Sequence, residues 1–359
     1  MSKRRLRVGF AGANAQRGWA KDAHLAAVRA LPDLELVAVS ARDQALADEA
    51  ARAFGAAKAY ADSLEMARDP DIDIIAVTVK VPEHRAIVLE ALKAGKHIYC
   101  EWPLGRDLAE AEEMAEIARA AGVHAAIGLQ GAHSKAVRHA AKLVSDGAIG
   151  RPLSLRVVSP TAGWGKESPA FYAYLQDKRN GATLSTIAGG HTLAAMEEVV
   201  GPFTEVSAIN SILVDEMRVS GTDELVKRTC PDHMLVIGRH ASGCVSSLEV
   251  AGGDAQSLFL FELRGSDGVL TIQGHFMGGY QGGNLIVTTS TEAAAQPPDI
   301  APELKGPPAN VSELYAALAN DIRTDARTVP DFDRAVRLTR LLDAIDAASD
   351  SGRRILLET

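Results

Sequence analysis

The segment LRVGFAGANAQRG, residues 6–18, decides the fold of this chain. It starts as a short apolar run typical of a strand, passes through a glycine turn and leads into a helical pattern that contains Leu25, Val28 and Leu31. A strand, a tight glycine turn and a helix N-terminus together aim backbone N–H groups and the positive end of the helix dipole at a pyrophosphate. The segment therefore predicts a dinucleotide-binding βαβ unit.

The glycine turn departs from the regular GxGxxG spelling. Asn14 stands where the middle glycine belongs, and Gly18 comes one residue late. Asparagine tolerates the left-handed backbone conformation better than most residues, so the turn can form, although the backbone approaches a phosphate less freely. The residues expected to bind the cofactor here are Gly9, Gly12, Asn14, Gly18 and Trp19. The alternative is a glycine turn with a purely structural role.

The end of the second expected strand bears on the choice of dinucleotide. That strand runs into Ser40, Ala41 and Arg42, with no Asp or Glu where an acidic side chain would accept the ribose hydroxyls of NAD. The hydroxyl of Ser40 and the guanidinium of Arg42 suit a 2′-phosphate instead. NADP(H) is therefore favoured over NAD(H), which remains the other option. The competing interpretation is that Arg42 is an ordinary solvated charge.

The first part of the chain alternates apolar runs with Ala-rich helical stretches. The runs are residues 6–11, 34–40, 72–79, 97–100 and 124–129. One helix is expected over 85–94, and a second starts at a capping box of Asp107 and Glu110 and ends near Gly122. This alternation predicts an α/β Rossmann domain with a doubly wound parallel sheet, assigned to residues 1–131.

After Gly150 the pattern changes to longer alternating strands. These are expected over 153–159, 204–213, 234–239, 244–250, 258–264 and 269–273. Turn signals at Ser242-Gly243 and at 266–268 join some of them, which predicts an open, mostly antiparallel sheet. Helices are expected over 191–200, 311–323 and 333–349, and a long loop over 289–308. Residues 132–359 are thus predicted to form an α+β domain for substrate binding and oligomerisation.

Composition narrows the class of protein. Hydrophobic residues make up 47% of the 359 residues and charged residues 23%, so the chain is expected to fold throughout. The net charge of -8 argues against nucleic acid as a partner. Cys100, Cys230 and Cys244 are widely spaced, which indicates neither a disulfide framework nor a metal site. With no targeting or membrane-spanning segment in the pattern, a cytoplasmic protein is expected.

Further motifs carry a family resemblance. In order and spacing they resemble the Gfo/Idh/MocA oxidoreductases over essentially the whole chain, and within that family most resemble the branch of the galactose-regulon repressor. The motifs are GAN at 12–14 with Gly18-Trp19, TVKVPEH at 78–84, GKHIYCEWPL at 95–104, LQG at 129–131, GAIG at 147–150, GWG at 163–165, GHT at 190–192 and PDH at 231–233.

The resemblance implies a cofactor lying across the carboxyl ends of the Rossmann strands. It adds cofactor-binding residues from three motifs, namely Val79, Pro82, His84, Glu101, Trp102 and Gln130. It also implies a sugar-like small-molecule substrate. A homodimer or homotetramer is expected to form through the open face of the second-domain sheet, because an exposed sheet face is covered by symmetric self-pairing.

The family's usual proton-handling groups are largely replaced in this chain. Trp102 stands where the family has a Lys, and tryptophan cannot exchange a proton at neutral pH. The positions where the family has Asp are Ile187 and Ala194, so only His191 remains. His191 is the leading catalytic candidate, or else a packed residue that shapes the helix start. Lys80 is the second candidate, or else a solvated loop charge.

Several side chains are expected to line a substrate pocket. They are Trp102, Trp164, Lys166, Tyr172, Tyr174 and His191. Trp164 would stack on a sugar ring, although core packing explains it equally well. His233 beside Asp232 would form an acid–base pair or a simple hydrogen bond at a strand start.

Three functions are compatible with these residues. The leading hypothesis is an NAD(P)-dependent oxidoreductase that transfers hydride to or from a sugar-like carbonyl or hydroxyl. The second is an oxidoreductive glycoside-cleaving enzyme with no net cofactor turnover. The third is a non-catalytic, dinucleotide-dependent sensor, because loss of the family Lys and Asp removes groups that often contribute ~100-fold to rate.

Overall fold

The computed structural model describes residues 4–253, 259–274, 279–282, 285–291 and 304–357. The chain forms two compact units, one of residues 1–130 and 300–337 and the other of residues 131–299 and 338–359. The predicted second domain, 132–359, therefore differs at 300–337. The helix α9 (Pro307–Thr324) belongs to the first unit because it buries Val311, Leu314 and Leu318 in the core of that unit.

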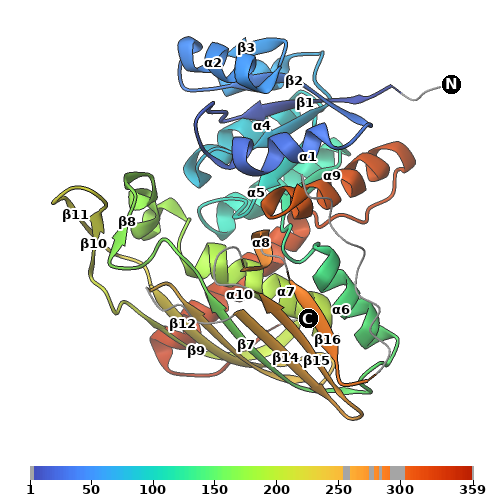
Figure 1. The fold of residues 1–359 in the computed structure, drawn as a ribbon, viewed down its shortest axis with the longest axis vertical. Coiled ribbons are helices and arrows are strands. Elements are labelled where there is room, and N and C mark those ends of the chain that lie inside the picture. Colours follow the sequence, from blue (N-terminus) through green and yellow to red (C-terminus); the bar gives the residue numbers. More distant parts are fainter. Residues whose placement is uncertain (1–3, 254–258, 275–278, 283–284, 292–303, 358–359) are drawn as a thin grey trace. The chain divides into compact units, whose positions relative to one another are not determined.

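The first unit contains a six-stranded parallel sheet in the order β3-β2-β1-β4-β5-β6 (Figure 1). Its strands are β1 (Leu6–Ala11), β2 (Leu34–Ser40), β3 (Lys58–Tyr60), β4 (Ile74–Val77), β5 (His97–Glu101) and β6 (Ala125–Gly128). The doubly wound parallel sheet is thus confirmed. The strand β3 was missed in the sequence, because three half-buried residues carry no readable alternation.

Helices cover both faces of this sheet. On one face α1 (Leu25–Arg29), α2 (Gln44–Phe54) and α9 share a hydrophobic core with β1 and β2. The crossover from β3 to β4 reverses direction, so α3 (Ser63–Arg68), α4 (His84–Lys93) and α5 (Leu108–Ala121) take the other face. The predicted start of α5 is confirmed, since the Asp107 carboxylate accepts the Glu110 N–H at 2.9 Å.

The second unit contains an eight-stranded sheet in the order β16-β15-β14-β7-β13-β12-β9-β17. Its strands are β7 (Pro152–Pro160), β9 (Phe203–Ser211), β12 (His233–His240), β13 (Val245–Ala251), β14 (Phe259–Gly265), β15 (Val269–Gly274), β16 (Ile286–Thr289) and β17 (Ile355–Leu356). All neighbours pair antiparallel except β7 with β13. The mostly antiparallel sheet is confirmed, and the predicted turns join β12 to β13 and β14 to β15.

A second, three-stranded sheet stands apart from the large one. It pairs β8 (Glu167–Ser168), β10 (Glu216–Val219) and β11 (Leu225–Lys227). The expected loop over 289–308 lies partly outside the described residues. Its last two residues were wrongly placed in a loop, because Pro307 and Pro308 open α9, where a proline costs no helical hydrogen bond.

Helices pack on one face of the large sheet and leave the other face open. Figure 1 shows α6 (Lys135–Ser145) and α7 (Gly190–Val200) along the covered face; a π-helix, η5 (Ser185–Gly189), precedes α7. The long helix α10 (Phe332–Ser351) ends in this unit, where Ser349 accepts the Asn210 N–H at 2.8 Å. Strand residues alternate between the two faces, so Met234 is buried while Leu235 is exposed.

Among the described helices, none combines the length and the hydropathy that a bilayer crossing requires.

Candidate functional site

The glycine turn is held against the ends of β2 and β4. The N–H groups of Gly12 and Ala13 both donate to the Ser40 carbonyl, at 3.1 and 2.8 Å. Gly12 has a φ of +94°, and a Cβ at this position would lie 2.6 Å from Cγ1 of Val79. Only glycine fits both demands. Val79, expected to touch the cofactor, therefore also packs directly on the turn.

The Asn14 side chain explains why the turn can form although the motif lacks its middle glycine. Its Oδ1 accepts the N–H groups of Gln16 and Arg17, at 2.9 and 3.1 Å. The side chain therefore orders the segment between the turn and the helix, as an asparagine does in an Asx turn. Gly18, at a φ of +98°, then begins a π-helix, η1 (Ala20–His24), by accepting the N–H groups of Lys21 and Asp22.

Trp19 follows the turn at the N-cap of η1 and is half-buried. Its indole Nε1 is buried and has no hydrogen-bond partner among the described residues. A buried indole N–H normally has an acceptor, so this donor is suited to a ligand oxygen.

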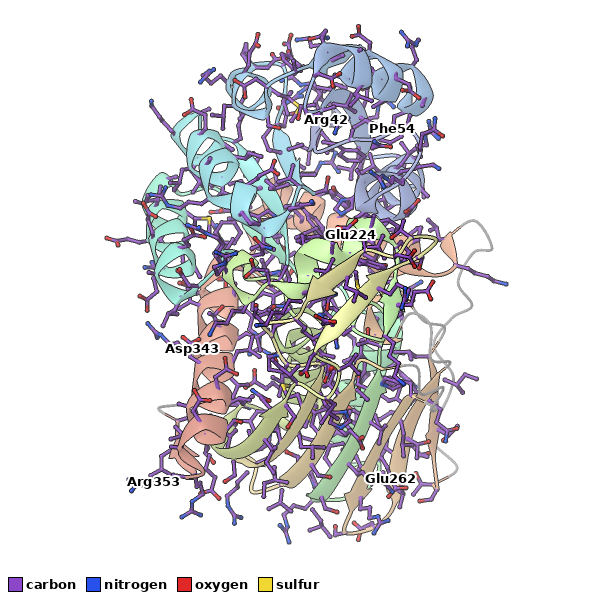
Figure 2. All side chains as sticks on the ribbon, turned by 90° about the vertical axis from the view of Figure 1, so that its left-hand side faces the viewer. Arg42, Phe54, Glu224, Glu262, Asp343 and Arg353 are labelled. Atoms are coloured by element: carbon purple, nitrogen blue, oxygen red, sulfur yellow. The ribbon has the colours of Figure 1, made fainter. Side chains whose placement is uncertain are left out.

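The two residues predicted to meet a 2′-phosphate differ in exposure. Ser40 is fully buried, and its Oγ lies 2.8 Å from Oγ of Ser63. The hydroxyl matched in the sequence to a 2′-phosphate is therefore buried against Ser63, because the end of β2 lies in the core. Arg42, labelled in Figure 2, has a side chain that is 85% exposed and lies 3.6 Å from Asp43. Arg42 is thus the member of the pair that can reach a phosphate.

The segment after β4 divides into exposed and buried members. Lys80 and Pro82 are exposed at the short 3-10 helix η2 (Val81–Glu83). His84 is buried, with Nε2 3.1 Å from the Val79 carbonyl and Nδ1 3.0 Å from the Pro103 carbonyl. Burial lowers the pKa of His84. His84 therefore braces two loops and does not present a ring nitrogen to a ligand.

The carboxyl end of β5 carries a buried hydrogen-bonded chain that sequence reasoning missed. Glu101 Oε1 lies 2.9 Å from His24 Nε2, and His24 Nδ1 lies 2.8 Å from the hydroxyl of Tyr315 on α9. Burial, and to a lesser degree the Glu101 charge, raises the pKa of Tyr315 well above its usual range. The only sequence signal was a histidine set among apolar residues in the helical stretch after the glycine turn.

Glu101 also contacts the end of β6. Gln130 Nε2 lies 3.4 Å from Glu101 Oε2, while Gln130 Oε1 is buried without a partner among the described residues. Gly128 makes room for the carboxylate, because a Cβ there would lie 2.9 Å from Oε1. Trp102, next in the chain, is only 5% exposed. The predicted residues Glu101, Trp102 and Gln130 therefore do gather at one edge of the parallel sheet.

In the second unit, His191 lies in the first turn of α7 and is 2% exposed. Its Nδ1 is buried and has no hydrogen-bond partner among the described residues. Burial lowers the pKa of His191 to about 3, so the imidazole is neutral near pH 7. The π-helix η5 immediately precedes it, and such bulges are frequent at functional sites.

Four other expected substrate residues lie in the segment 164–174 of the second unit. Trp164 is 3% exposed, and its Nε1 donates to the Leu175 carbonyl at 3.4 Å. Lys166 is exposed, Tyr172 and Tyr174 are half-buried, and burial raises the pKa of Tyr174 to about 12. Arg228, which the sequence did not single out, donates to the Gly165 carbonyl at 2.8 Å and thereby holds the Trp164 segment.

Asp232 is the ion-pair partner of Arg228, at 2.5 Å. The suggested Asp232–His233 pair does not form, because consecutive residues at the start of β12 point to opposite faces and His233 instead lies 3.2 Å from Glu249.

Two family models match the chain. The model described as an oxidoreductase family with an NAD-binding Rossmann fold matches residues 6–129. The model of the Gal80p C-terminal domain matches residues 136–274.

Individual relatives include a dehydrogenase and a regulator. Dehydrogenase aclE of Aspergillus oryzae is 30% identical over 332 residues, covering 89% of this chain and 88% of that protein. The galactose/lactose metabolism regulatory protein GAL80 of Kluyveromyces lactis is 31% identical over 297 residues, covering 76% of this chain and 65% of that protein.

A solved structure of levoglucosan dehydrogenase in complex with NADH and levoglucosan superposes with a TM-score of 0.83 at 22% identity, covering 99% of this chain and 100% of that one. At this identity the likeness supports the fold alone. The fold, the glycine turn and the matched models together define the class as proteins with an NAD-binding Rossmann fold. This chain belongs to the Gfo/Idh/MocA oxidoreductase family, with a C-terminal part of the Gal80p type.

Proposed function

We propose that the chain is an NAD(P)-dependent oxidoreductase acting on a sugar-like hydroxyl or carbonyl. The observation that carries this proposal is the buried Nδ1 of His191, which lacks a partner among the described residues. A buried polar atom costs free energy unless it is hydrogen-bonded, so its retention argues for a ligand that completes it. A relative that covers 89% of this chain is named a dehydrogenase.

The first unit has features that fit a dinucleotide. The tight turn can form at Gly12 because this residue has no Cβ to collide with Val79. Trp19 Nε1 and Gln130 Oε1 are buried without partners among the described residues. These donor and acceptor atoms would meet the cofactor's polar groups, and the exposed Arg42 would favour the 2′-phosphate of NADP(H). NAD(H) is the alternative, since a structural neighbour holds NADH.

When bound, the nicotinamide supplies the acceptor or donor of hydride. His191, being neutral, would hydrogen-bond the reacting oxygen and orient it. In alcohol oxidation its Nδ1 would accept a hydrogen bond from the substrate hydroxyl; a ring with a pKa of about 3 is a weak proton acceptor, so this contact would mainly orient the oxygen. Trp102 cannot take the proton either.

The experiment compares wild type with His191→Asn. Calorimetry gives the Kd for NAD(H) and NADP(H), and absorbance of the reduced nicotinamide follows turnover on sugars, polyols and keto-sugars. We expect turnover on at least one compound, a loss of at least about tenfold in His191→Asn, and an unchanged Kd. Equal turnover in the two proteins would remove His191 from the mechanism.

A second candidate function is a non-catalytic, dinucleotide-dependent sensor. Two observations favour it: Trp102 replaces the family lysine, and a relative that matches 76% of this chain is named a regulatory protein. Tight dinucleotide binding with no turnover on any compound of the panel would put this candidate first.

A further inference from the structure

The buried chain Tyr315–His24–Glu101 has a defined direction. A carboxylate only accepts hydrogen bonds, so His24 donates to Glu101 from Nε2; in the neutral imidazole, Nδ1 then accepts the Tyr315 hydroxyl. The raised pKa of Tyr315 keeps that hydroxyl protonated as a donor. The direction therefore runs from Tyr315 through His24 to Glu101, and it fixes one tautomer of the histidine.

Packing prevents His24 from leaving this arrangement. The side chain has no exposed surface, and the rings of Phe10, Tyr99 and Tyr315 stand edge-on to it, with centroids 5.8, 5.0 and 5.5 Å away. An imidazole that cannot rotate holds the carboxylate to which it is hydrogen-bonded in one orientation. Residues that contact a functional side chain but not the ligand commonly act in this way.

The far side of Glu101 keeps capacity for a ligand. The side chain is 13% exposed, an ionised carboxylate has about four acceptor sites, and the contact from Gln130 is long at 3.4 Å. In the strand order of this sheet, β1 and β2 carry the glycine turn and Arg42, where the adenosine half binds. Strand β5 lies across the switch point between β1 and β4, on the side of the other half of the dinucleotide.

We propose that His24 and Tyr315 are positioning residues that aim the Glu101 carboxylate at the hydroxyls of the ribose next to the nicotinamide. The inference rests on the proposed function, because it requires a bound dinucleotide. It adds two residues, one from the π-helix η1 and one from the helix α9, to the nicotinamide half of the site.

The test measures the Kd values of ADP and of ADP-ribose by calorimetry. Both compounds carry the adenosine and pyrophosphate, and only ADP-ribose carries the second ribose. The ratio of the Kd of ADP to the Kd of ADP-ribose therefore measures what that ribose contributes to affinity. We expect His24→Leu to reduce the ratio about tenfold, because a hydrogen bond to a charged group is lost, while the Kd of ADP stays within about twofold. His24→Gln retains a donor toward Glu101 and should recover most of the ratio.

Two tyrosines in the same aromatic cluster provide a matched pair of variants. Tyr315→Phe removes the hydroxyl that donates to His24 and should reduce the ratio about two- to fivefold. Tyr99→Phe removes a buried hydroxyl with no partner among the described residues and should leave the ratio unchanged. The inference is overturned if wild type binds ADP-ribose more tightly than ADP and every variant keeps that ratio, or if Tyr99→Phe acts like Tyr315→Phe. Failure of wild type to bind either compound would instead count against the proposed function.

Discussion

A Cβ on residue 12 would lie only 2.6 Å from Cγ1 of Val79, which is closer than two carbon atoms can approach without a shift. Gly12→Ala would therefore add steric overlap to the cost of a backbone at φ +94°. We expect the free energy of unfolding to fall by about 2–4 kcal/mol and dinucleotide affinity to be lost. Urea unfolding and calorimetry give the two quantities.

Gly18 provides the control for this prediction. It also has a positive φ, +98°, but a Cβ there would meet nothing within 4 Å. Gly18→Ala should cost only the backbone strain, about 1–2 kcal/mol. In Gly12→Ala, the added change Val79→Ala should recover part of the loss. Equal costs at the two glycines would show that Val79 does not constrain the turn.

Arg42 should set the preference between the two dinucleotides. In Arg42→Ala we expect NADPH affinity to fall about tenfold relative to NADH, because a charge-assisted contact to the 2′-phosphate is removed. Arg52→Ala, an exposed arginine in the last turn of α2, should change neither affinity. An equal loss for both dinucleotides in Arg42→Ala would contradict the assignment.

Two histidines whose pKa is lowered by burial predict that the stability of the fold falls at a pH above the range in which carboxylates titrate. Burial lowers the pKa of His97 to about 4 and that of His191 to about 3. The unfolded chain therefore binds more protons than the folded one below about pH 6.5. Stability should be highest above that pH and fall as the pH drops toward 4, by up to ~1.4 kcal/mol per pH unit for each histidine.

His97→Asn separates this effect from acid unfolding in general. The side-chain oxygen of the introduced asparagine can still accept the backbone N–H of residue 124. In the wild type, the His124 backbone nitrogen lies 3.1 Å from Nδ1 of His97. Thermal unfolding between pH 7 and 4.5 should show a shallower loss of stability in the variant. An identical slope would mean that His97 does not titrate between the two states.

The open face of the large sheet should mediate self-association. Ile209 and Leu235 pair across β9 and β12, and Ile209 and Ile237 are 62% and 61% exposed. Glu262, labelled in Figure 2, lies on the same sheet in β14. Sedimentation should find a dimer or tetramer that Ile209→Lys/Ile237→Lys converts to a monomer. Leu213→Lys, an exposed leucine beyond β9, is the control, and a monomeric wild type would refute the prediction.

The sequence predicted the elements whose physics is local. The strand β1 has a continuous apolar run, and α5 has an Asp cap and a left-handed glycine at Gly122, so both were located closely. Glu101, Trp102 and Gln130, which were predicted to contact the cofactor, also lie at one sheet edge, because parallel strands end together.

What the sequence could not supply depends on long-range packing. His24, Glu101 and Tyr315 are far apart along the chain, and nothing near any of them predicts the others. The membership of α9 in the first unit likewise depends on which core its apolar face joins. The burial of Ser40 was also not evident, because the alternation of β2 does not say where the strand passes into the core.

The most direct measurement follows deuterium from reduced cofactor labelled at nicotinamide C4 into product. Purified protein is incubated with labelled NADPH or NADH and a panel of keto-sugars, and the products are examined by mass spectrometry. We predict one deuterium on the carbinol carbon of at least one product, at a rate lowered at least about tenfold in His191→Asn. Tight binding of the cofactor with no deuterium in any compound would contradict the oxidoreductase assignment.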